Sequence, residues 1–69
     1  MQISARNLLK GTVKSVNLGA VNAEVVISVA PEVEIVSIIT KASAESLGLE
    51  VGKEVYATIK SSDVMVAID

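Results

Sequence analysis

The chain has 69 residues, of which 51% are hydrophobic, and a formal net charge of −2. This length predicts a single domain, residues 1–69. The absence of cysteine and histidine excludes disulfides and thiolate or imidazole metal sites. We therefore expect the small fold to be stabilised by association with other copies of the chain. The acidic balance and the single aromatic residue, Tyr56, argue against nucleic acid as a partner, because phosphates attract positive charge and bases stack on rings.

The first predicted strand runs from Ile3 to Val16 and carries Gly11 near its middle. A glycine inside a strand often marks a bulge or a sharp coil. We therefore expect one long strand that bends and serves two sides of a small barrel. Asn17–Ala20 predicts a turn, because Asn and Gly tolerate the positive φ of hairpin connections.

The next two predicted strands are Val21–Val29 and Val33–Thr40. Alternation in the first of them places four apolar residues on one face, which are Ala23, Val25, Ile27 and Val29. Pro31 separates the two strands, because proline cannot donate a hydrogen bond to the ladder. The second is apolar on both faces, which predicts a strand that is covered on both sides.

A short helix is predicted from about Ala42 to Leu47, with Thr40 or Ser43 as its N-cap. Gly48 is placed to end it in the left-handed conformation. Glu54–Lys60 is the fourth predicted strand.

Val64–Ile68 is the fifth predicted strand, and it is apolar on both faces. Five strands with a short helix between the third and the fourth is the element order of the OB-fold. The sequence therefore predicts an all-β, OB-like five-stranded Greek-key barrel with one short helix.

Arg6, close to Ser4 at the head of the first strand, is a candidate for binding an anion. A guanidinium offers a planar fork of N–H donors, and a hydroxyl and backbone amides add more. The alternative is that Arg6 is a solvated residue that keeps the N-terminus soluble. Lys60 ends the fourth predicted strand, and from the residues alone it is as well explained by a solvated strand end that discourages edge aggregation as by anion binding.

Catalysis is not expected. Without histidine or cysteine the usual nucleophile and base pairs cannot form, and the eight carboxylates are scattered without a paired motif. We expect neither an enzyme nor direct ligands for a metal cation. Charged residues interrupt every apolar run before the roughly 20 residues of a spanning helix, and no signal peptide precedes Arg6, so we expect a cytoplasmic protein with no membrane partner.

Several blocks resemble one known family throughout the chain. They are Met1–Asn7, Lys10–Val13, Gly19–Val25, Ser46–Leu49 and Lys60–Met65. Together they are similar to the molbindins, small cytoplasmic molybdate-binding proteins of the Mop or TOBE type. Two positions depart from the family pattern: Leu8 stands where a polar residue is common, and Ala30–Glu32 replaces a turn that is commonly glycine-rich.

The resemblance implies a homo-oligomer, a hexamer built as a trimer of dimers, that binds molybdate or tungstate at subunit interfaces and needs no organic cofactor. In one class of site, Ser4, Ala5 and Arg6 of one subunit would meet Lys60 and Ser61 of another.

The second class of site that the resemblance implies lies nearer the three-fold axis. There the backbone amides of Gly19, Ala20 and Val21 would bind the anion, and successive amides of a turn can form such a nest.

Three function classes follow. The first is intracellular storage and homeostasis of molybdate or tungstate. The second is a stand-alone interaction or sensory module of a molybdate-responsive regulator or transporter, and the third is a nucleic-acid-binding barrel, which the charge and the aromatic content disfavour.

Overall fold

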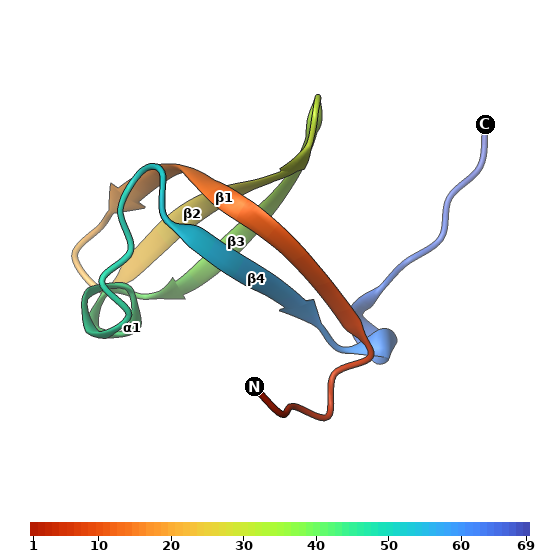
Figure 1. Cartoon of the computed structure of the whole chain (residues 1–69), viewed down its shortest axis with the longest axis horizontal. Helices are drawn as coiled ribbons and strands as arrows, with labels where there is room; N and C mark the ends of the chain where they lie inside the picture. Colours follow the sequence, from red (N-terminus) through yellow and green to blue (C-terminus); the bar gives the residue numbers. More distant parts are fainter.

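The first strand, β1 (Asn7–Leu18), pairs with two different neighbours in the computed structural model, which describes all 69 residues (Figure 1). Its first half, Asn7–Thr12, is antiparallel to β4 (Glu54–Ile59). Its second half is antiparallel to β2 (Asn22–Ala30), with Thr12 opposite Ser28. One long strand therefore serves two sides of the fold, as its central glycine predicted, although it begins at Asn7 and not at Ile3.

The hydrogen-bonded order of the sheet is β3-β2-β1-β4, and β3 spans Val33–Thr40. All three pairings are antiparallel, and the sheet curls so that β3 and β4 face each other across an open side (Figure 1). The register of β1 on β2 shifts between Val13 and Ser15, and a bulge of this kind increases the local coil of a strand. Both edges of the sheet, β3 and β4, lack a neighbouring strand within the chain.

The connection from β3 to β4 contains α1 (Lys41–Ser46). The side chain of Thr40, one of the two predicted N-caps, accepts a hydrogen bond from the Ser43 amide at 3.0 Å. At the other end Gly48 has φ +63°, and the bonds from its amide to Glu45 and from Leu49 to Ala44 form a Schellman motif. The helix therefore begins and ends where its capping residues indicate. No helix of the chain is long and apolar enough to cross a membrane.

The core lies on the concave face of the curled sheet. Val13, Val25, Ile27 and Ala57 form its buried cluster. Around it pack half-buried apolar residues from every strand and from the β4 approach, which are Val16, Val29, Ile35, Ile39, Leu49 and Val55. Only six of the 69 residues are buried, so the single chain hides little of its apolar content.

The predicted fifth strand is wrong for the single chain. After β4 the chain makes a short 3-10 helix, η1 (Ser61–Asp63), and residues 64–69 then run away from the sheet (Figure 1). A strand needs an edge to pair with, and this segment reaches neither β3 nor β4. Met65, Val66 and Ile68 are consequently 90% or more exposed, and the sheet has four strands in a barrel that stays open.

The outer face of β3 also differs from the expectation of a strand covered on both sides. Val36 and Ile38 point outward and are about 60% exposed, whereas Ile35 and Ile39 face the core. Nothing within the chain covers the outer face, because α1 packs at the end of the sheet.

Candidate functional site

The register of β1 on β4 brings the two predicted anion-binding segments to one end of the chain. Asn7 opposite Ile59 is the last pair of this ladder. Residues 4–6 lead into that pair and residues 60–61 leave it, and Figure 1 shows the N-terminal segment and η1 at the same end of the sheet. Extending the register by one residue places Arg6 opposite Lys60, which are 54 positions apart in the sequence.

Arg6 and Lys60 are two cations without a carboxylate partner. Lys10 pairs with Glu54 at 3.7 Å, and Lys14 pairs with Glu34. Neither ion pair involves Arg6 or Lys60, and both of these residues are exposed. Two like charges at one end of the ladder would attract an anion, since Asp63, the nearest carboxylate to Lys60 along the chain, forms an ion pair with neither cation.

Smaller donors surround the two cations. Ser4 is exposed and Ala5 is half-buried, and both precede the first residue of β1. Lys60 is the N-cap of η1, whose hydrogen bonds begin with the Asp63 amide to the Lys60 carbonyl oxygen at 2.9 Å. The Ser61 amide comes before this first bond, so it is free to donate to a ligand. The segment thus offers side-chain and backbone donors together.

The second predicted set, Gly19, Ala20 and Val21, lies at the opposite end of β1, in its turn to β2. The Gly19 amide donates to the Asn22 carbonyl oxygen at 2.7 Å, which closes the turn. The whole of β1, 12 residues and roughly 36 Å along the strand, separates this set from Arg6, so one chain does not combine the two in a single site. The two sets are separate candidates.

Lys41 is a further cation near the second set, and its position there depends on strand pairing that the sequence alone does not specify. Its amide donates to the Val21 carbonyl oxygen at 2.7 Å, and the side chain has no ion pair. The signal was weak, because Lys41 is 20 residues from Val21 and is close to it only through the pairing of Asn22 with Thr40.

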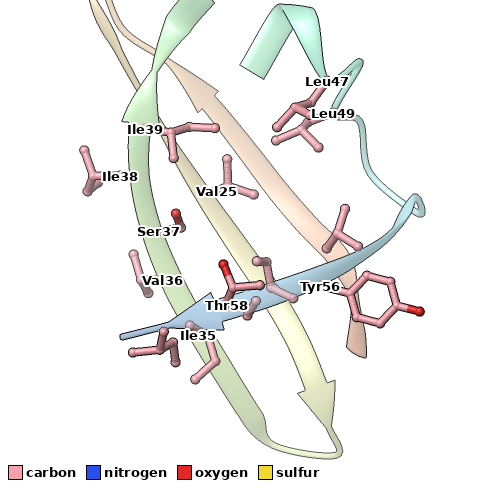
Figure 2. A pocket seen from close by; sticks show the side chains of 14 residues that line it. Val25, Ile35, Val36, Ser37, Ile38, Ile39, Leu47, Leu49, Tyr56 and Thr58 are labelled. Carbon is pink, nitrogen blue, oxygen red and sulfur yellow. The ribbon is translucent and has the colours of Figure 1, made fainter. Parts of the chain in front are cut away.

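An apolar groove of about 520 Å³ lies between the two edge strands, and its lining ends at Ile59, the residue before Lys60. Figure 2 shows side chains of β3 and β4 facing each other across it, with Leu47 and Leu49 at one end. Twelve of its 14 lining residues are hydrophobic, and it contains no charged side chain. The groove therefore suits an apolar segment and cannot hold a small dianion.

No group of three or more His, Asp or Glu side chains that could hold a metal ion is present. The donor groups at both sets are cationic, hydroxyl or amide groups, and such donors bind anions.

The chain is a small, curled, all-β domain of the OB-like type with one short helix. The family model of the TOBE domain matches residues 3–66. Molybdenum-pterin-binding protein 3 of Clostridium pasteurianum is 52% identical over 66 residues, which cover 96% of this chain and 97% of that protein. The chain belongs to the TOBE family, in its molybdenum-pterin-binding or Mop group, as the resemblance predicted.

Solved structures agree with this assignment. A molybdate-binding protein from Sporomusa ovata superposes with a TM-score of 0.91 at 37% identity, and the match covers 99% of this chain and 100% of that chain. The cytoplasmic molybdate-binding protein ModG, solved with molybdate bound, gives 0.88 at 46% identity over 94% of this chain and 46% of that chain. Some curated relatives are longer, and the chain spans 26% of their length.

Proposed function

We propose that this protein binds molybdate or tungstate at the subunit interfaces of a homo-oligomer and stores the anion in the cytoplasm. One observation carries the proposal: the β1–β4 ladder ends with two unpaired cations, Arg6 and Lys60, beside free hydroxyl and amide donors. Relatives described as molybdate-binding proteins support the choice of anion.

The surface area of the chain supports the proposed assembly. A folded monomer of 7.2 kDa has an accessible surface of about 4,100 Å² by the usual scaling. This chain exposes 5414 Å², roughly 1,300 Å² more than that scaling gives. A standard interface buries about 800 Å² on each partner, so the excess is more than one such contact would cover. A hexamer, with two kinds of contact per subunit, would cover it.

The open groove and the exposed C-terminal segment are both apolar. Val64–Ile68 is apolar and extended, and β3 and β4 lack the strand that would close the barrel between them. We propose that this segment of one copy lies in the groove of another. Only η1 (Ser61–Asp63) separates Lys60 from this segment. Such an exchange would therefore hold the Lys60 region at an interface between two copies.

Catalysis and an organic cofactor form no part of the proposal. The names of the Clostridium relatives include a pterin, and a planar pterin would be expected to stack on an aromatic ring. Tyr56, the one aromatic residue, lies opposite Lys10 in the ladder and not beside the candidate donors. Free molybdate should therefore bind without a pterin.

A second candidate function is an interaction or sensory module. Its support is that the chain is 49% identical to part of the molybdenum transport protein ModE of Azotobacter vinelandii and spans 26% of that protein. Storage requires only the anion and copies of this chain. A sensory module also requires a second protein, whose affinity for this chain changes when the anion is bound.

Gel filtration of the purified protein after incubation with sodium molybdate tests the proposal. We expect molybdenum to elute with the oligomer, in amounts unchanged by added pterin. Elution of all molybdenum at the salt volume would overturn the proposal, and retention only in the presence of a second protein would favour the sensory module.

A further inference from the structure

Asn7 joins the two candidate anion-binding segments through its side chain. Its Nδ2 donates a hydrogen bond of 3.2 Å to the carbonyl oxygen of Ile59, 52 positions along the chain. This is the only side-chain hydrogen bond between β1 and β4, and the Asn7 side chain is half-buried. The bond therefore reinforces the ladder at its last pair.

The position of this bond matters because of what adjoins it. Arg6 directly precedes Asn7, and Lys60 directly follows Ile59. Neither cation has an ion pair that would position it, and both lie beyond the last pair of the ladder. Terminal pairs of a sheet open most easily. The Asn7 side-chain bond stabilises the terminal pair, Asn7 with Ile59, and both cations are attached directly to this pair.

Repulsion between the two cations would act against closure of this end of the ladder. In the absence of an anion, like charges opposite each other destabilise a strand pair. The ladder would tend to open at this end and separate Arg6 from Lys60. A neutral amide opposes this opening without adding a charge that would compete for the anion.

We propose that Asn7 is a positioning residue for oxyanion binding, acting through Arg6 and Lys60 and not by contact with the anion. The inference rests on the proposed function, because it needs the anion to bind where these two cations lie. Removing an outer partner that orients a ligand group costs roughly 10–100-fold in affinity at metal sites, and we expect an effect of similar size here.

Calorimetric titration with sodium molybdate tests the inference on three variants of the full chain. Asn7→Ala removes the donor, and Asn7→Leu removes it while keeping the side-chain volume in case alanine fails to fold. Asn7→Gln keeps an amide donor on a longer stem. We expect Asn7→Ala and Asn7→Leu to lower molybdate affinity about tenfold or more, and Asn7→Gln to restore part of the loss.

Gly52→Ala is the matched control for general destabilisation. Gly52 has φ +94° and no atom within 4 Å of a new Cβ, so alanine strains the backbone without touching either candidate segment. We expect it to lower stability toward urea as Asn7→Ala does but to leave molybdate affinity unchanged.

These measurements distinguish a failure of the positioning role of Asn7 from a failure of the proposed anion binding. Unchanged affinity in Asn7→Ala and Asn7→Leu would overturn the positioning role, and so would an equal loss in Gly52→Ala. Absence of binding to the wild-type oligomer would instead overturn the proposed function, and this inference with it.

Discussion

Gly11 of β1 lies against the backbone of Ser28 in β2, so closely that a Cβ at Gly11 would stand 2.6 Å from the Ser28 carbonyl oxygen. Ile27 Cγ2 would be 2.7 Å away on another side. Real Cβ contacts are essentially never shorter than 3.0 Å, and a backbone oxygen in a ladder cannot move aside. This contact lies next to Thr12, where β1 passes from β4 to β2.

Gly11→Ala should therefore destabilise the protein, although a glycine-to-alanine change in an unstrained strand is usually favourable. Overpacking of this kind costs about 1–3 kcal/mol, and we expect a loss of free energy of unfolding in that range. Urea denaturation at fixed protein concentration measures it. The neighbouring exposed residue provides the control, Thr12→Ala, which should change stability by less than about 1 kcal/mol. An alanine variant as stable as the wild type would show that the strands do not approach so closely.

The C-terminal segment should control assembly. Removing residues 64–69 takes away the apolar segment that follows η1 and leaves the groove between β3 and β4 open. Sedimentation at micromolar concentration should then show loss of the hexamer and smaller or aggregated species. Removing Asp69 alone is the control and should leave assembly intact. A hexamer that persists without residues 64–69 would mean that another surface, such as the outer face of β3, holds the copies together.

Arg6 and Lys60 should contribute to the same class of site. Hydrogen bonds to charged groups are worth about 1.5–3 kcal/mol, so Arg6→Ala and Lys60→Ala should each weaken molybdate binding by roughly tenfold or more. Both side chains are exposed and unpaired, so assembly should survive. Lys10→Ala removes one positive charge from β1, outside both candidate segments, and should leave the affinity unchanged. Calorimetry in which Arg6→Ala and Lys60→Ala keep every wild-type site would contradict the assignment.

The site should discriminate among anions by their protons and their size. Arg6, Lys60 and the nearby hydroxyl and amide groups can all donate, so a fully ionised dianion is preferred. Hydrogen phosphate carries a P–OH donor, and a buried donor without a partner costs about 1–3 kcal/mol. Sulfate has no proton but is smaller than molybdate, so fixed donors would contact it less well. In competition against bound molybdate, we expect tungstate to have an affinity near that of molybdate, sulfate a clearly weaker one and phosphate the weakest. Equal displacement by phosphate and tungstate would show that the site is not composed of donors alone.

Much of the fold could be predicted from local patterns. Alternation identified the buried face of β2, where Ala23, Val25 and Ile27 are buried. Thr40 and Gly48 located the ends of α1, because capping chemistry is local. The segment Val64–Ile68 has a strand pattern and yet pairs with nothing in one chain, since β pairing depends on a partner edge that its own sequence does not contain.

The candidate site could be predicted only in part. Arg6 stood out because cations are few, but its nearness to Lys60 depends on the register of β1 on β4, which no single segment specifies. Asn7 looked like one residue of a polar block, and its bond to Ile59 became visible only in the folded chain. Lys41 was missed for the same reason, because only the end of the β2–β3 ladder brings it near Val21.

Native mass spectrometry of the protein loaded with molybdate counts subunits and bound anions in the same particle, so it tests whether the anion is bound at subunit interfaces. We expect hexamers that carry molybdate and monomers that carry none, with fewer anions on hexamers of Arg6→Ala. Monomers that retain molybdate, or hexamers that never carry it, would contradict a site built at subunit interfaces.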